Sequence, residues 1–154
     1  MSRALLCVAV LLVACEGGAE PAPWTCTLTR VIDGDTLHAR CDGEKVKVRL
    51  LRIDTPEREE PGYRAAGAAL RGFLGSDPIA LEFERPGVRV ADDYGRILAY
   101  VRVRGEIANV EMVRLGWSPF WTRYGKGRFA DAFRGAEREA RDAHRGLWGE
   151  ESAR

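Results

Sequence analysis

The chain has 154 residues, with 24 Lys and Arg, 23 Asp and Glu, and a formal net charge of +1. Residues 1–14 contain one basic residue, Arg3, and no acidic one, so the remainder is formally neutral. A neutral protein is not attracted to nucleic acid by its bulk charge, so any such binding requires a local basic patch. The residues after this leader are enough for one domain with one hydrophobic core.

Residues 1–14 have the features of a bacterial lipoprotein signal peptide. An apolar run follows the first positive charge and is too short to span a bilayer. It ends in Leu12-Val13-Ala14-Cys15, which resembles the lipobox, where a signal peptidase cuts before a cysteine that carries the lipid. We therefore expect export, lipid attachment at Cys15, and a location at the cell envelope, facing the periplasm or the cell surface. The alternative is an ordinary secretory signal cut near Ala19, which would discard Cys15.

Small and polar residues with two prolines fill 15–23, which is typical of a flexible tether. The segment that follows, 24–41, is predicted to be a β-hairpin. Residues 24–32 and 37–41 alternate as strands, and Asp33-Gly34 is a strong signal for a two-residue turn. Asp35 comes directly after this turn, so its carboxylate is expected at the rigid end of the hairpin.

Two cysteines flank the hairpin, Cys26 and Cys41. With a two-residue turn they lie opposite each other, and in an oxidising compartment they would form a disulfide. Two buried free thiols are the alternative, because a one-residue slip of the register would separate them.

The stretch from Arg49 to Glu57 has the densest set of polar groups beside a predicted strand, 44–53. Pro56 ends that strand, so Asp54, Thr55 and Glu57 follow a strand end whose backbone the sheet holds still. Two carboxylates and a backbone carbonyl suit a hard cation such as Ca²⁺. Arg49, on the same strand, suits a phosphate. Taken alone, this segment is also typical of an ordinary turn.

Apolar residues at helical spacing predict a helix over 63–74 and another over 129–143, and Asn109 is predicted to cap a short helix that ends near Leu115. Two further strands are expected at 79–83 and 97–103. Five short strands with about three helices predict an α+β domain over 24–149, built on a five-stranded OB-type β-barrel, with a short tail at 150–154. No internal repeat or transmembrane span is visible.

Three motifs in this order and spacing resemble the staphylococcal nuclease family. They are Val31-Ile32-Asp33-Gly34-Asp35-Thr36, then the stretch from Arg49 to Glu57, and then the stretch from Asp93 to Val101. Each motif is weak by itself, and their combination carries the resemblance, which extends from about Trp24 to Trp148.

The resemblance implies an OB-type barrel and a Ca²⁺-dependent phosphodiesterase that acts on DNA and RNA, single-stranded or locally opened. It also implies a role for each matching position. Asp35 and Asp54 correspond to the Ca²⁺ carboxylates and Thr55 to a backbone carbonyl ligand, Glu57 activates or orients the attacking water, Arg49 and Arg96 grip the phosphate, and Tyr94 lies near the nucleotide. One departure is Asp93, where the type member of the family has a lysine.

Four aromatic residues lie in an extended stretch after the second predicted helix: Trp117, Phe120, Trp121 and Tyr124. They could stack on bases, with Tyr124 as a candidate for substrate binding, or they could pack at the rim of the barrel. Two histidines, His38 and His144, lie in different predicted elements, so histidine-based chemistry and a zinc site are poorly supported.

Two functions remain open at this level. One is an exported, lipid-anchored, monomeric endonuclease with no obligate protein partner, which meets the membrane only through its anchor. The other is a catalytically silent OB-type module that binds nucleic acid or protein. A pure binder has no use for three carboxylates near a phosphate, since they repel it unless a cation intervenes. The sequence therefore favours the enzyme.

Overall fold

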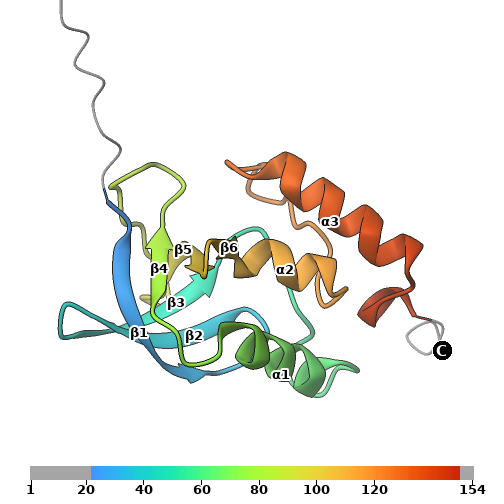
Figure 1. Cartoon of the computed structure of the whole chain (residues 1–154), viewed down its shortest axis with the longest axis horizontal. Coiled ribbons are helices and arrows are strands. Elements are labelled where there is room, and N and C mark those ends of the chain that lie inside the picture. The colour runs from blue at the N-terminus through green and yellow to red at the C-terminus, as the bar shows by residue number, and fades with distance from the viewer. Residues whose placement is uncertain (1–21, 150–154) are drawn as a thin grey trace, which may run out of the picture.

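The computed structural model describes residues 22–149 (Figure 1). The predicted signal peptide, Cys15 and most of the tether lie outside the described residues, as does the tail at 150–154. Within 22–149, no helix has both the length and the apolar character needed to cross a membrane.

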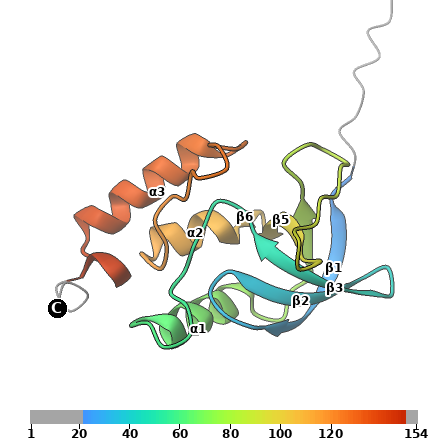
Figure 2. The same cartoon turned by 180° about the vertical axis from the view of Figure 1, so that it is seen from behind.

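Six strands, three α-helices and one short 3₁₀ helix make up the domain over residues 22–149 (Figures 1 and 2). In chain order they are β1 (Trp24–Val31), β2 (Thr36–Cys41), β3 (Glu44–Leu50), α1 (Tyr63–Leu74), β4 (Ile79–Glu82), β5 (Ile97–Val103), β6 (Glu106–Ile107), α2 (Ala108–Arg114), α3 (Ala130–Asp142) and η1 (Gly146–Trp148).

The strand order is β3-β2-β1-β4-β5-β6, and a parallel pairing between β3 and β5 closes the first five strands into a barrel. The predicted α+β class and five-stranded OB-type barrel with three helices are therefore confirmed. The strands differ in detail from the prediction. The third strand ends at Leu50 instead of Ile53, the fourth ends at Glu82 instead of Phe83, and β6 is a two-residue extension that pairs only with β5 among the described strands.

Alternation along the strands builds the barrel interior. Val46, Val48 and Leu50 of β3 are buried while the residues between them face outward. The helices close the barrel on one side, with α2 between the strands and α3 (Figures 1 and 2). Helix α3 is amphipathic, and it buries Phe133 and Ala136 on its apolar face because it contacts the rest of the domain on one side only.

The predicted pairing of Cys26 with Cys41 is correct, but for a reason that the sequence did not indicate. The Ile32 N–H donates to the Thr36 carbonyl (2.9 Å), so the loop has three residues, Asp33-Gly34-Asp35, and the predicted two-residue turn is wrong. A bulge at Thr29 takes up the extra residue, because the register shifts between Leu28 and Arg30. The two deviations cancel, and Cys26 still lies opposite Cys41.

Cys26 and Cys41 form the predicted disulfide, with their Cα atoms 4.2 Å apart. Both residues are buried in the barrel wall. The bond therefore joins β1 to β2 at the end of the hairpin away from Asp35.

Removing this disulfide is expected to destabilise the domain. A cross-link over a sequence separation of 15 stabilises by about 3 kcal/mol at most. We expect urea unfolding of a Cys26→Ala, Cys41→Ala variant to show a loss of about this size. Reductant should lower the stability of the wild type similarly and leave the variant unchanged. Two alkylated thiols in the non-reduced wild type would contradict the bond.

Candidate active site

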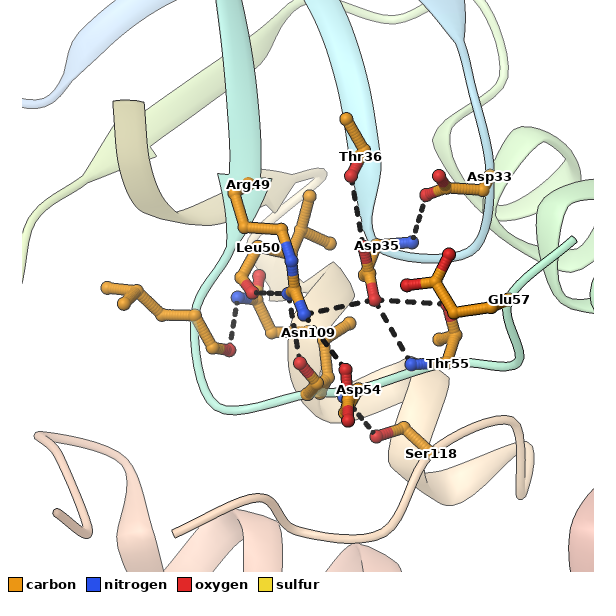
Figure 3. Close-up of polar contacts among 12 residues, drawn as sticks. Asp33, Asp35, Thr36, Arg49, Leu50, Asp54, Thr55, Glu57, Asn109 and Ser118 are labelled. Atoms are coloured by element: carbon orange, nitrogen blue, oxygen red, sulfur yellow. Dashed lines mark hydrogen bonds and ion pairs between the residues drawn. The ribbon is translucent and has the colours of Figure 1, made fainter. Parts of the chain in front are cut away.

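Asp35 links the hairpin loop to the segment that leaves β3. Its Oδ2 accepts hydrogen bonds from the Thr55 N–H and the Thr55 hydroxyl, both at 3.1 Å, and lies 3.2 Å from Arg49 Nη2 (Figure 3). Its Oδ1 accepts from the Thr36 hydroxyl (3.0 Å). Asp35 is only 5% exposed, and these donors hold its carboxylate in one orientation.

Gly34 allows the hairpin loop to approach Thr55 and α1. A Cβ at this position would lie 2.7 Å from Thr55 Oγ1 and 2.8 Å from the Ala66 Cβ. Gly34 is not among the glycines with positive φ, so it is needed here for space and not for backbone freedom. The three-residue loop therefore seats Asp35 against Thr55 only because its middle residue has no side chain.

Arg49 lies between the two aspartates. The same Nη2 that contacts Asp35 is 3.2 Å from Asp54 Oδ1, and Nη1 donates to the carbonyls of Leu50 (2.6 Å) and Ile53 (2.9 Å). One nitrogen of Arg49 therefore contacts both carboxylates. The guanidinium is thus fixed by its own backbone while it bridges the two acids.

Two buried polar residues hold the turn after β3 from behind. The Asn109 side chain donates to the carbonyls of Leu51 (2.9 Å) and Ala99 (3.2 Å) and accepts from the Val101 N–H (2.9 Å). The Asp54 N–H donates to Ser118 Oγ (2.8 Å). The predicted capping role of Asn109 is wrong, since the N-cap of α2 is Ile107. Asn109 satisfies the barrel backbone instead.

Around Asp35 and Arg49, carboxylates outnumber positively charged groups. Glu57 is exposed, forms no ion pair in the described part of the chain, and points toward Asp35 (Figure 3). Burial, and then repulsion by Asp35, Asp33 and Asp54, raises the pKa of Glu57. Burial is also the main cause that raises the pKa of Asp54, with Asp35 adding to it and Arg49 opposing it. A bound cation would relieve this repulsion.

The oxygen atoms of Asp35, Asp54 and the Thr55 carbonyl are of the type that Ca²⁺ prefers as ligands. Asp35 and Asp54 provide carboxylates, and no hydrogen bond from residues 22–149 reaches the Thr55 carbonyl oxygen. No three His, Cys, Asp or Glu side chains in that range are placed to hold a metal ion by themselves. Ca²⁺ commonly completes a shell of six to eight oxygens with water and substrate oxygens, so two carboxylates and a carbonyl form a partial site of the right type.

Arg96 faces a cavity beside these acids. The Asp92 carboxylate accepts from Arg96 Nε (2.8 Å) and from the backbone N–H groups of Arg96 (2.9 Å) and Tyr94 (3.0 Å). Burial alone would raise the pKa of Asp92, but the hydrogen bonds from Arg96 together with its charge lower it. Asp92 therefore stays ionised and holds Arg96 through Nε, and neither Nη group donates a hydrogen bond within residues 22–149.

The cavity has a volume of about 540 Å³, and both Arg49 and Arg96 line it together with Tyr94, Trp121 and Tyr124. Tyr94 and Tyr124 are 80% and 71% exposed, so they stand at its rim. Asp35, Asp54, Thr55 and Glu57 are not among the cavity-lining residues. Arg49 is the residue that belongs to both the acidic cluster and the cavity.

The aromatic stretch divides between the two roles that its sequence left open. Phe120 stacks on Phe133 of α3, with ring centroids 4.9 Å apart, and packs against the core. Trp121 lines the cavity, with its ring 6.0 Å from the Arg49 guanidinium and 5.2 Å from the Tyr124 ring. Tyr124 and Trp121 are thus placed where an aromatic ring could meet a ligand.

A partly buried network that the sequence did not predict holds this aromatic stretch. Arg52 donates to the Tyr124 carbonyl (2.6 Å) and to Glu84 Oε2 (2.9 Å), and its own carbonyl accepts from the Trp121 N–H (3.0 Å). Tyr100 donates to the same Glu84 oxygen (2.6 Å). Burial and the hydrogen bond with Glu84 raise the pKa of Tyr100 to about 12. An arginine between Leu51 and Ile53, in an otherwise apolar run, was the available signal.

Comparison with known proteins shows which family the domain resembles. A family model described as "Staphylococcal nuclease homologue" matches residues 47–150. Protein ParB of Escherichia coli is 34% identical over 162 residues, which covers 99% of this chain and 86% of ParB. A thermonuclease of Staphylococcus intermedius is 31% identical over 125 residues (77% and 73%). Endonuclease YncB of Bacillus subtilis (strain 168) is 33% identical over 129 residues (79% of this chain), and the match spans only 60% of YncB.

Replacing Gly34 with alanine tests the close approach of the hairpin loop. The new Cβ would overlap Thr55 and Ala66, so we expect the unfolding free energy to fall by about 1–3 kcal/mol. Gly72→Ala is the matched control, because Gly72 is exposed on α1 and a Cβ added there would meet no atom within 4 Å. That change should be stabilising by about 0.5–1 kcal/mol. Equal effects in urea unfolding would contradict the steric account.

Proposed function

The chain belongs to the staphylococcal nuclease family, and from this we propose that it hydrolyses phosphodiester bonds of DNA and RNA in a Ca²⁺-dependent reaction. The observation that carries the proposal is the position of Arg49, which bridges Asp35 and Asp54 and also lines the cavity with Arg96. A phosphate in that cavity would lie against two guanidinium groups and beside a cluster of carboxylates.

Arg49 and Arg96 are suited to bind the phosphate and to stabilise charge that builds up on it. Both guanidinium groups are held before substrate arrives, Arg49 by two backbone carbonyls and Arg96 by Asp92. Donors that are already oriented toward developing charge lower a barrier without reorganising during the reaction. The Nη groups of Arg96 allow the two-point contact with phosphate oxygens that a lysine cannot make.

Asp35, Asp54 and the Thr55 carbonyl are the groups that would hold Ca²⁺. When bound there, the ion would supply positive charge to polarise a phosphate oxygen. Glu57 is assigned the role of general base, or at least of orienting the attacking water. Its raised pKa makes it a better proton acceptor than an ordinary glutamate, and its exposed carboxylate can reach solvent.

The rim of the cavity is suited to bases of a single strand or of a locally opened duplex. Tyr94, Tyr124 and Trp121 present aromatic rings beside the two arginines. Stacking on such rings tolerates any base, because every base has a π-face. Asp93, also at the cavity, places an acid where a nucleotide phosphate would approach, and we expect it to weaken binding there.

We also propose that the chain is exported and anchored at the cell envelope through a lipid on Cys15, with 1–14 as signal peptide and 15–23 as tether. The domain over 24–149 would then act as a monomer outside the cytoplasm, where the Cys26–Cys41 disulfide is stable.

Substitutions at the site should lower the nuclease activity in two different ways, one that high Ca²⁺ partly reverses and one that it does not. Asp54→Asn removes a candidate Ca²⁺ ligand, so activity should fall and partly return at high Ca²⁺. Arg96→Lys keeps the charge but loses the planar grip, so the rate should drop on the order of 10² without a change in the Ca²⁺ requirement. Glu57→Gln should lower turnover by about 10² or more. The measurement is DNA cleavage against Ca²⁺ concentration, with folding checked by circular dichroism.

Glu59→Gln provides the matched control for Glu57→Gln, since Glu59 is an exposed acid on the same loop. Its activity should equal that of the wild type. If the folded wild type binds DNA but cleaves none at any Ca²⁺ concentration, the nuclease proposal is wrong and a silent binding module replaces it.

Cys15→Ser tests the lipid anchor. The variant should remain unprocessed or appear in a soluble form, whereas the wild type should partition into the detergent phase of a detergent separation. A wild-type protein that stays in the aqueous phase and begins after Ala19 would exclude the anchor.

A further inference from the structure

We propose that Arg52 is a positioning residue, which fixes loop 121–127 against the barrel and thereby sets the affinity of the site for the base of its substrate. The loop begins at Trp121, carries Tyr124 and ends at Gly127, and both of its aromatic residues line the cavity. The proposal rests on the proposed function, because it concerns how the substrate is bound. Arg52 acts through the loop and not on the reacting phosphate.

Arg52 and its neighbours contact the loop at its start, its middle and its end. The Trp121 N–H donates to the Arg52 carbonyl (3.0 Å), and Arg52 Nη1 donates to the Tyr124 carbonyl (2.6 Å). A Cβ on Gly127 would lie 2.6 Å from Arg52 Nε and would also overlap the Tyr100 hydroxyl. The backbone at Gly127 therefore lies directly on the side chains of Arg52 and Tyr100.

The middle of the loop depends on Arg52 for its attachment. Residues 122–126 are all exposed, and Gly125 bonds only within the loop, to the Thr122 carbonyl (2.9 Å). Within residues 22–149, the bond from Arg52 to the Tyr124 carbonyl is the one hydrogen bond that joins 122–126 to the rest of the domain. Loss of the Arg52 guanidinium would therefore release Tyr124.

Arg52 occupies a conformation that costs free energy. Its φ is 65°, in the left-handed region that glycine adopts more readily than a residue with a side chain. Its Nε is buried without a hydrogen-bond partner in the described part of the chain. Two such costs at a residue only two positions before Asp54 indicate that its side chain has a functional role.

Glu84 and Tyr100 hold the guanidinium of Arg52 from the barrel side. Arg52 Nη2 donates to Glu84 Oε2 (2.9 Å), and the Tyr100 hydroxyl donates to the same oxygen (2.6 Å). Tyr100 is fully buried in β5, so it ties Glu84 to the barrel wall. Both Nη groups of Arg52 are thus engaged by the protein, and Arg49 and Arg96 remain the residues proposed to bind the phosphate.

The position of the loop determines where an aromatic ring meets a base. The Trp121 ring lies 6.0 Å from the Arg49 guanidinium and 5.2 Å from the Tyr124 ring. A nucleotide whose phosphate contacts Arg49 would therefore have these rings beside its base. Rings that are fixed before binding reduce the ordering cost of binding. Arg52 should thus affect the affinity for the base and not the chemical step.

Arg52→Met removes the guanidinium and keeps most of the apolar stem. The variant should fold, because the Glu84 side chain is 38% exposed and still accepts from Tyr100, and the carbonyl of the exposed Tyr124 can bond water. Arg52→Gly is the second variant, and it also relieves the left-handed backbone. Arg102→Met is the matched control. Arg102 likewise bonds one carboxylate, that of Glu82, and one backbone carbonyl, that of Gly105, but it does not line this cavity.

The test separates base contacts from phosphate contacts. Binding of a short fluorescent single-stranded oligonucleotide, and of an abasic oligonucleotide with the same number of phosphates, is measured by anisotropy in the Glu57→Gln background with Ca²⁺. Cleavage of the oligonucleotide that carries bases gives kcat and KM with Glu57 intact. Circular dichroism checks the folding of each variant.

Arg52→Met should weaken binding of the oligonucleotide with bases about five- to tenfold, as expected for the loss of one stacked ring. It should leave the abasic oligonucleotide unaffected, and it should raise KM while kcat stays unchanged. Tyr124→Ala should have the same effect. The combined variant should bind no more weakly than the weaker single variant, because both changes remove the same contact. Arg102→Met should match the wild type.

An equal loss on the abasic oligonucleotide, additive losses in the combined variant, or an equal loss in Arg102→Met would overturn the proposal. If Arg52→Met does not fold, the same criteria apply to Arg52→Gly, and failure of both to fold would make Arg52 a structural residue only. A wild type that cleaves nothing, while the base-dependent loss of binding persists, would overturn the proposed function and still support the role of Arg52. A wild type that binds neither oligonucleotide would overturn both.

Discussion

The contact between Asp35 and Thr55 is the interaction on which the candidate site depends. It joins a hairpin loop to a turn 20 positions away in the chain, through two hydrogen bonds to one buried carboxylate oxygen. The contact requires Gly34, since any side chain there would overlap Thr55 and α1. A bulge in β1 and a three-residue loop place Asp35 where it can make these bonds. The barrel is thus a frame that brings the ends of two strands together.

Arg49 connects the acids at this junction to the cavity. Its guanidinium is bonded to its own backbone and shared by two acids, and it opens onto the cavity that Arg96 also lines. Repulsion among the acids, in addition to burial, raises the pKa of Glu57. The single guanidinium of Arg49 does not balance this number of carboxylates, and under this condition the binding of a metal ion is favourable. The proposed phosphate-binding and cation-binding parts of the site meet at this residue.

Patterns local in sequence predicted most of the fold, because alternation and turn residues depend on neighbours in the chain. The cysteine pairing was correct although the turn was wrong, since the Thr29 bulge compensated for the longer loop. Asn109 was misassigned because capping and backbone bonding across the barrel require the same side chain. The network of Arg52, Glu84 and Tyr100 was missed because its members are far apart in sequence and meet only after the barrel closes. Motif resemblance suggested candidate roles for Asp35, Asp54 and Arg49, while their shared geometry required the tertiary structure.

The central claim is that Asp35 organises a cation site beside Arg49, and calorimetric titration of Ca²⁺ into the purified protein tests it most directly. The wild type should bind one Ca²⁺ per chain, more tightly when a nucleoside phosphate is present, because the phosphate adds oxygen ligands and neutralises Arg49. Asp35→Asn should abolish or strongly weaken this binding while circular dichroism shows an intact barrel. A wild type that binds no Ca²⁺, or a folded Asp35→Asn variant that binds it as well as the wild type, would contradict the account.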